Sequence, residues 1–330
     1  MSTPTLAPWK GVTPIYLGNP SYTKSGKTYK AEPSGLTIYS DGGSKWLFMV
    51  SDNGIVAKAQ LPSSGSPTGT LNWLINPTPD EDDKAYDYES VTFANGNLMI
   101  GVEGDRSEGS SKTSPVVKRF DQDRTSSSKP AGDFTGSTWT LNGIDFGSAT
   151  NSGMEGMTLV PFGSYPSNWT GGAAPHYGGI FFVAVQALAG RVYVYDLPQG
   201  GGNSANVNPL NLGTSASNPL QVPNPSATSG SKPLISDLFF DGSSRVLYAL
   251  YDGEGNSQVT AKDYLQKLTI STASNTTAAN ALTQAWAYEL PWLDCEGLAI
   301  NGNDLYISID SGSHPGNDGI FVLPGLLSKL

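Results

Sequence analysis

Hydrophobic and polar positions follow one repeated pattern along the chain. A small or acidic residue opens a short apolar strand, a Gly, Asn or Asp turn follows, and a second apolar strand ends at an acidic or amide residue. The five copies of this pattern begin at Ser34, Glu89, Glu155, Ser236 and Glu296. Their strands are rich in β-branched and aromatic residues, and turns such as Asn95-Gly96-Asn97 are typical of β-hairpins. The pattern predicts five similar units of antiparallel strands.

Further strands complete each unit. Third strands are expected at residues 55–61, 116–120, 191–197, 264–270 and 319–323, and fourth strands at 70–75, 137–142, 218–222 and 284–290. The last unit lacks a fourth strand, and residues 13–18 near the N-terminus can supply it and so cover an open sheet edge. We therefore predict an all-β fold, a five-bladed β-propeller closed by the N-terminal strand, with residues 1–330 forming one domain. The alternative is a six-bladed ring with a blade in 198–233, which we interpret as a surface loop because Gly, Ser, Asn and Pro dominate it.

Composition narrows the function classes. With 39 Gly and 23 Pro among 330 residues, the chain is poorly suited to a helical bundle. The formal charge, 19 − 29 = −10, opposes binding to nucleic acid or anionic lipid, and no apolar run is long enough to span a membrane. A single cysteine, Cys295, excludes an internal disulfide and a cysteine-based zinc site, and two histidines, His176 and His314, exclude a multi-histidine metal centre. Oxygen ligands and hard cations are the metal chemistry that remains.

The residues that open the repeats are the candidate metal ligands. The first strand of each propeller blade lines the central channel, so its opening residues are expected to form a ring around the axis. Three carboxylates held that close together repel one another unless a cation lies between them. Five side-chain oxygens with added water suit calcium, because magnesium prefers a tighter octahedral site and transition metals prefer histidine or thiolate. We predict a Ca²⁺ site with the ligands Ser34, Glu89, Glu155, Ser236 and Glu296. Asp237 could replace Ser236, and a polar channel filled only with water is the alternative interpretation.

A second set of polar residues follows from the hairpins. The second strand of each repeat runs antiparallel to the first, so it ends on the face where the first strand began. These ends carry Asp52, Glu103, Gln186, Asp252 and Asp310. We predict that Asp52, Glu103, Asp252 or Asp310 serves as general base or as ligand of further metal ions, and that Arg106, Arg191 or His314 stabilises developing charge. The alternative is that such residues only cap strand ends and start turns.

The repeats also resemble a known family. The segments Ser34-Gly35-Leu36, Gly153-Met154-Glu155-Gly156, Ser236-Asp237-Leu238 and Glu296-Gly297-Leu298 resemble the "esterase-like activity of phytase" domain over residues 30 to 323. The order Ser, Glu, Glu, Ser, Glu is similar to that of the calcium-activated nucleotidases (apyrases), which are five-bladed propellers with one axial calcium. This resemblance implies that the five ring residues bind calcium. It differs at the strand ends, where the nucleotidases carry Lys and Arg and this chain carries acidic residues.

These observations predict a calcium-dependent hydrolase of phosphate esters or anhydrides that acts on a small molecule as a monomer. Further calcium ions are expected between the acidic face and a phosphorylated substrate, because a protein of charge −10 repels phosphate. Two alternatives stay open: hydrolysis of esters or lactones at the same calcium, and a non-catalytic propeller, stabilised by calcium, whose loop face binds a partner or a glycan. Trp169 and Tyr177 are the aromatic candidates for a sugar platform. Composition favours a secreted or periplasmic protein, although the start MSTPTLAPWKG carries no signal peptide and equally fits a cytosolic one.

Overall fold

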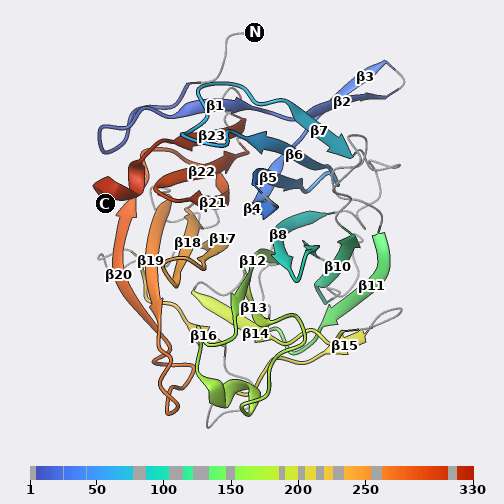
Figure 1. Cartoon of the computed structure of the whole chain (residues 1–330), viewed down its shortest axis with the longest axis vertical. Coiled ribbons are helices and arrows are strands. Elements are labelled where there is room, and N and C mark those ends of the chain that lie inside the picture. The colour runs from blue at the N-terminus through green and yellow to red at the C-terminus, as the bar shows by residue number, and fades with distance from the viewer. Residues whose placement is uncertain are drawn as a thin grey trace.

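The computed structural model consists of β-strands arranged as a ring of five blades (Figure 1). It describes residues 5–24, 26–41, 43–76, 87–103, 114–121, 134–145, 153–185, 190–199, 205–212, 219–225, 234–253, 262–310 and 318–330. Within these ranges the helical segments are two short 3₁₀ turns, η2 (Ser167–Thr170) and η3 (Leu326–Lys329). None of the described helical segments has the length and hydropathy that a bilayer crossing requires.

The first three strands of each blade are antiparallel and follow chain order from the axis outward. Blade 1 contains β4 (Pro33–Asp41), β5 (Ser44–Ser51), β6 (Val56–Leu61) and β7 (Trp73–Asn76). Blade 2 contains β8 (Tyr88–Ala94), β9 (Asn97–Val102), β10 (Val116–Asp121) and β11 (Phe134–Leu141). Blade 3 contains β12 (Met154–Pro161), β13 (Gly179–Val185), β14 (Arg191–Tyr195) and β16 (Leu220–Gln221). Blade 4 contains β17 (Leu234–Asp241), β18 (Val246–Asp252), β19 (Tyr264–Ile270) and β20 (Leu282–Glu289).

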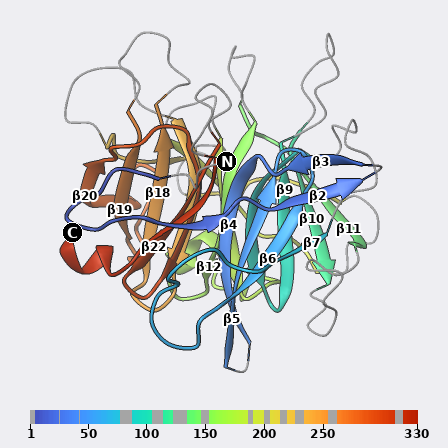
Figure 2. The ribbon, with the colours of Figure 1, turned by 90° about the horizontal axis from the view of Figure 1, so that it is seen from above.

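Blade 5 is closed by the N-terminal part of the chain. Its own strands are β21 (Cys295–Asn301), β22 (Asp304–Ile309) and β23 (Gly319–Leu323), and β1 (Ile15–Gly18) pairs antiparallel with β23. Both ends of the chain thus meet in one sheet, as Figure 1 shows beside the N label. The predicted five-bladed propeller and its closure by the N-terminal strand are confirmed. The hairpin of β2 (Ser21–Lys24) and β3 (Lys27–Lys30) projects from the edge of the ring in both views (Figure 2).

The described parts of residues 198–233 extend two existing blades, so the six-bladed alternative is wrong. β15 (Ala205–Val207) pairs in parallel with β11 and becomes a fifth strand of blade 2. β16 pairs with β14 and completes blade 3. β16 confirms the fourth strand expected at 218–222, whereas β15 lies in the part of the segment that its composition assigns to a surface loop. Both short strands cover the edges of neighbouring blades.

The five first strands surround the axis. β4, β8, β12, β17 and β21 each contact the first strand of both neighbouring blades, which closes the circle. Apolar residues fill the spaces between neighbouring blades in five separate clusters. The two faces of each sheet therefore pack against its neighbours, and the sheets' edges at the axis are left to polar residues.

The turn between β17 and β18 contains a carboxylate that the structure ties to the backbone. Asp241 accepts hydrogen bonds from the Ser243 amide (3.0 Å), the Ser243 hydroxyl (2.7 Å) and the Ser244 hydroxyl (2.5 Å). Partial burial acts to raise the pKa of Asp241, but these hydrogen bonds outweigh it, and the pKa is lowered overall. A lowered pKa means that the ionised form stabilises the fold.

Asp241→Asn is therefore expected to reduce the free energy of unfolding by about 1 kcal/mol at pH 7. Because the folded-state pKa is depressed, the contribution of Asp241 is present above the unfolded-state pKa and is lost as the pH falls through the folded-state value. Urea unfolding of both proteins at several pH values from 7 downward measures this. The difference between them should shrink as the solution becomes acidic, and a constant difference would contradict the expectation.

Candidate functional site

The five residues that open the repeats occupy equivalent places in the structure. In every blade the register between the first and second strands shifts at this residue, so that it has no regular partner on the neighbouring strand. The shifts lie between Pro33 and Leu36, Tyr88 and Ser90, Met154 and Gly156, Ile235 and Asp237, and Cys295 and Gly297. Such β-bulges re-aim a side chain out of the regular alternation. Ser34, Glu89, Glu155, Ser236 and Glu296 thus share one backbone irregularity around the axis, and we call them the axial ring.

Three glycines next to the axial ring keep the ring narrow. A Cβ atom at Gly35 would lie 2.8 Å from the carbonyl oxygen of Glu89, and one at Gly297 would lie 2.4 Å from that of Ser34. A Cβ atom at Gly156 would lie 2.8 Å from the backbone of Asp237. Each of these contacts is made by the first strand of a neighbouring blade. Only glycine, which has no Cβ atom, lets these strands approach so closely. The three glycines that follow ring residues therefore allow the axial ring to be narrow.

Glu155 lies close enough to the other two glutamates of the axial ring to raise their pKa values. Burial is the main reason that the pKa of Glu89 lies well above its usual range, and the negative charges of Glu155 and Asp87 add to the shift. Burial also raises the pKa of Glu296, with further contributions from Asp252 and Glu155. Glu155 is buried and acts on both of the other glutamates. The predicted carboxylates do converge, and a cation between them would remove this electrostatic cost.

The two serines of the axial ring are buried and bonded to backbone carbonyl groups. The Ser236 hydroxyl donates to the carbonyl oxygen of Cys295 (2.8 Å) in blade 5. The Ser34 hydroxyl donates to the carbonyl oxygen of Glu32 (3.3 Å). A hydroxyl whose proton is used in this way keeps its lone pairs for a cation. The carboxylate of Asp237, the alternative to Ser236, is instead bonded to backbone amides, so its oxygens face the strands.

The carboxylates at the second-strand ends gather beside the axial ring. Asp52 follows β5, Glu103 follows β9, Asp310 follows β22, and Asp252 is the last residue of β18. Burial, together with the charges of Glu32, Asp310 and Asp87, raises the pKa of Asp52 to about 9. Asp52 also acts on Glu89, and both Asp252 and Asp310 act on Glu296. The predicted second set of acidic residues therefore forms one electrostatic cluster with the axial ring.

Asp87 belongs to this cluster, and the repeat pattern did not single it out. One oxygen each of Asp87, Glu89 and Glu103 lies within 4.8 Å of the other two, a spacing that a shared metal ion requires. Asp87 and Glu89 are half-buried, and Glu103 is buried. Asp87 stands two residues before Glu89, and the alternation of side chains along a strand could have indicated that both share a face. Glu103 in turn needs Gly153, because a Cβ atom there would overlap the Glu103 side chain.

The predicted cationic residues have different outcomes. Arg106, His314 and also Gln186 lie outside the described residues. Arg191, at the start of β14, forms an ion pair with Asp145 (3.5 Å between Nη1 and Oδ2). Its charge is therefore already neutralised within the protein, and a role in stabilising developing charge stays a prediction.

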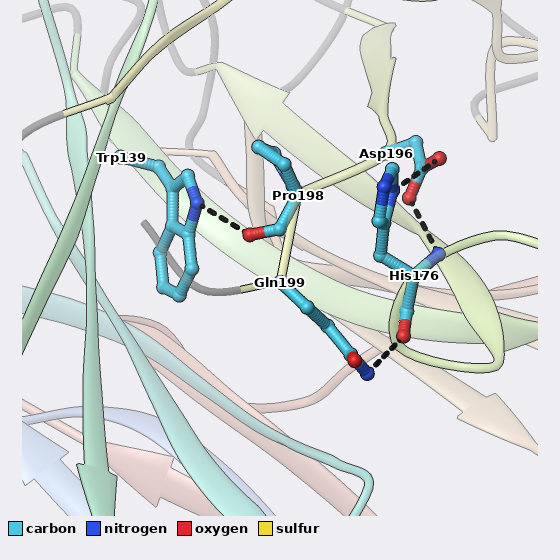
Figure 3. A network of polar contacts seen from close by, with 5 residues as sticks. All are labelled: Trp139, His176, Asp196, Pro198 and Gln199. Atoms are coloured by element: carbon cyan, nitrogen blue, oxygen red, sulfur yellow. Dashed lines mark hydrogen bonds and ion pairs between the residues drawn. The ribbon is translucent and has the colours of Figure 1, made fainter. Parts of the chain in front are cut away.

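The described histidine lies away from the axial ring. His176 precedes β13, and β13 starts opposite the end of β12, so this histidine lies on the face opposite to the acidic cluster. Figure 3 shows how Asp196 accepts from both the amide and the Nδ1 atom of His176, at 3.1 and 3.0 Å. The side-chain amide of Gln199 binds the carbonyl oxygen of the same histidine (Figure 3). These contacts fix a loop.

Trp169 and Tyr177 do not form a sugar platform. Both residues are buried, and each exposes 3% of its surface. The Trp169 ring stacks on Tyr165, and the Tyr177 ring packs edge-on against Trp139. These two candidates for a sugar platform are core residues instead: Trp169 belongs to the apolar cluster between blades 3 and 4, and Tyr177 to the cluster between blades 2 and 3.

Comparison with known proteins identifies the fold. No protein-family model matches this chain, and no curated protein matches it in sequence. A candidate glycoside hydrolase from Bacteroides ovatus has a similar structure, with a TM-score of 0.52 and 11% identity over 96% of this chain and 94% of that one. Another, from Parabacteroides distasonis, has a TM-score of 0.50 and 10% identity over 94% and 93% of the two chains. At such identities the likeness shows the propeller fold alone.

Proposed function

We propose that this chain is a calcium-binding propeller that hydrolyses phosphate esters or anhydrides. The observation that carries the proposal is the axial ring, in which five oxygen-bearing side chains sit at five equivalent β-bulges around one axis. An arrangement that only satisfied strand ends would not need all five residues at the same irregular position. The shared position of the five residues therefore favours a common ligand at the centre of the ring.

The donor set fits calcium. The ring offers three carboxylates and two hydroxyls, and calcium takes six to eight oxygen ligands, with water completing the set. Burial first, and then the neighbouring negative charges, raise the pKa values of Glu89 and Glu296, and a divalent cation would compensate these charges. Histidine and thiolate ligands are absent among the described residues nearby, since the Cys295 thiol is buried within the core between blades 4 and 5. These features favour a hard cation over a transition metal.

The chain's own residues would then perform the reaction beside the ring. Asp52 and Asp310 are half-buried, so part of each side chain is open to solvent. A cation bound beside Asp52 would lower its pKa from the raised value of about 9, and the ionised carboxylate could then take a proton from an attacking water molecule. One buried oxygen of Asp52 has no hydrogen-bond partner in the described structure. Asp87 and Glu103, together with Glu89, would hold a further cation that accepts a phosphate oxygen. A bound divalent ion supplies charge neutralisation for the phosphate.

The choice of phosphate as the substrate class rests on the resemblance of the repeats to the phytase-related domain and to the calcium-activated nucleotidases. The order Ser34, Glu89, Glu155, Ser236 and Glu296 supports it. The acidic strand ends add a condition to this proposal: a phosphate could approach Asp52, Glu103, Asp252 and Asp310 only together with cations.

A second candidate is a structural calcium in a non-catalytic propeller. The burial of the axial ring favours it: Ser34, Glu155 and Ser236 each expose less than 9% of their surface, which leaves an axial ion little contact with solvent. Such an ion would stabilise the five first strands against one another without touching a substrate. The two candidates share the axial site and differ in what the half-buried carboxylates do.

Calcium titration and a hydrolase screen separate the candidates. Calorimetry of chelator-treated protein should show calcium binding, and the melting temperature should rise with calcium concentration. Phosphate release should then require calcium when nucleotides, phytate and simple aryl phosphates are offered, while carboxylic aryl esters and lactones test the ester alternative. Binding without turnover of any substrate would support the structural ion. Absence of calcium binding would refute both candidates.

A further inference from the structure

Asp237 is the most constrained carboxylate of the propeller. Its residue surface is 1% exposed, and it lies directly after Ser236 of the axial ring. One carboxylate oxygen accepts the amide of Leu238 (2.7 Å), and the other accepts the amide of Leu298 (2.7 Å). A further backbone hydrogen bond comes from Leu36. One carboxylate thus binds backbone amides from three blades: blade 4, blade 5 and blade 1.

The positions of these amides relate Asp237 to the axial ring. Leu238 stands two residues after Ser236, Leu298 two residues after Glu296, and Leu36 two residues after Ser34. The Asp237 carboxylate therefore binds the amide at the same position, two residues after the ring residue, in three different repeats. Because each ring residue sits on a β-bulge, where regular strand pairing does not fix it, this tie compensates for the missing pairing.

The neighbouring repeats leave room for this arrangement. The residue after the ring residue is glycine in blades 1, 3 and 5, at Gly35, Gly156 and Gly297. A side chain at any of them would collide with the backbone of an adjacent first strand. In blade 4 the same position holds Asp237, whose carboxylate reaches past blade 5 to blade 1. The five repeats therefore share the same backbone position at the ring residue, but the residue that follows it differs between blades.

We propose that Asp237 is a positioning residue of the calcium site: it fixes Ser34, Ser236 and Glu296 relative to one another through their backbones without itself binding the ion. This inference rests on the proposed calcium site. It assigns Asp237 a role different from that of a replacement ligand for Ser236, because both its oxygens are already occupied by amide donors. Residues that orient metal ligands from behind commonly contribute a factor of about 10 to 100 to metal affinity.

The test compares Asp237→Asn with Thr158→Val. In Asp237→Asn the shape is kept, but an NH₂ group replaces one of the oxygens and faces a backbone amide that also donates. Thr158 is a matched control because its buried hydroxyl accepts the amide of Phe240 (3.0 Å) between blades 3 and 4, three residues beyond the ring residue Glu155. Both variants lose a buried inter-blade hydrogen bond, but only Asp237→Asn disturbs the backbone beside the ring.

Calorimetric titration of the full chain with calcium alone gives the readout. We expect calcium affinity to fall about 10-fold to 100-fold in Asp237→Asn and to stay within about twofold of wild type in Thr158→Val. Loss of stability in both variants with unchanged calcium affinity in Asp237→Asn would show a structural role only and overturn the inference. If wild type itself does not bind calcium, the proposed function fails before this comparison is made.

A second variant covers the case in which Asp237→Asn does not fold without calcium. Asp237→Ser introduces the residue that blade 2 carries at the same position, Ser90, and shortens the side chain so that it no longer reaches blade 1. Refolding of Asp237→Asn and of Asp237→Ser is measured as a function of calcium concentration. We expect the midpoint of refolding to require at least about tenfold more calcium than in Thr158→Val. Equal midpoints would contradict the inference.

Discussion

Glu155→Gln is expected to abolish calcium binding in the micromolar range while it leaves the calcium-free protein at least as stable as wild type. Glu155 is the buried carboxylate whose charge acts on both Glu89 and Glu296. Glutamine keeps the shape and removes the charge, so a cation loses one of three anionic ligands while the mutual repulsion in its absence decreases. We expect at least about a 100-fold loss of affinity, which corresponds to about 2.8 kcal/mol.

Two measurements check this expectation. Calorimetry gives the calcium affinity, and thermal unfolding with chelator and with excess calcium gives the calcium-dependent rise in melting temperature, which should vanish in the variant. The control is Glu289→Gln on β20, where the exposed carboxylate pairs with Lys262 (2.7 Å) and lies outside the axial ring. Its calcium affinity should equal that of wild type. If the Glu155→Gln protein binds calcium with wild-type affinity, the axial ring is not the calcium site.

Gly297→Ala is expected to reduce the free energy of unfolding by about 3 kcal/mol, a large effect for a single methyl group. The new Cβ atom would lie 2.4 Å from both the carbonyl oxygen of Ser34 and the hydroxyl of Ser308. It would enter the contact in which Ser308 donates to Ser34 (3.2 Å) across blades 5 and 1. Gly297 is paired with Ser308. Ser34 lies between Pro33 and Leu36, which both pair with β5, so the collision is relieved mainly by separating the blades where the ring closes.

Equilibrium urea unfolding measures this loss, with Gly242→Ala as the control. Gly242 lies in the turn between β17 and β18, where an added Cβ atom would meet nothing within 4 Å. The control should unfold within about 0.5 kcal/mol of wild type. Because Ser34 is itself a ring residue, Gly297→Ala should also weaken calcium binding. Unchanged stability would mean that the first strands of blades 5 and 1 are not in close contact.

Most of the fold could be predicted from local patterns. Alternating apolar residues and hairpin turns report strand pairs directly, and the missing fourth strand of the fifth repeat predicted that residues 13–18 would close the ring, as β1 does. Within 198–233, β16 confirms the fourth strand expected at 218–222, whereas β15, which joins blade 2, was not predicted. Such strands are stabilised by the edges they cover rather than by their own residues, so their local sequence carries little signal.

The residues of the candidate site were likewise predicted only in part. The spacing of the repeats identified all five residues of the axial ring and the four described carboxylates at the strand ends. It did not identify Asp87, which joins the cluster by its place on the same strand face as Glu89. It also named Trp169 and Tyr177 as candidates for a sugar platform, although both rings are buried in the apolar clusters on either side of blade 3.

The sequence by itself determined which residues open the five first strands, because a repeat marks equivalent positions and a closed ring of equivalent positions has one centre. Only the tertiary structure decided what each of those residues contacts. The backbone amides bound by Asp237 come from repeats about 60 and 200 residues away, and the atoms that exclude a side chain at Gly297 belong largely to another blade. Contacts between blades join residues distant in the chain, and periodicity within one repeat carries no information about them.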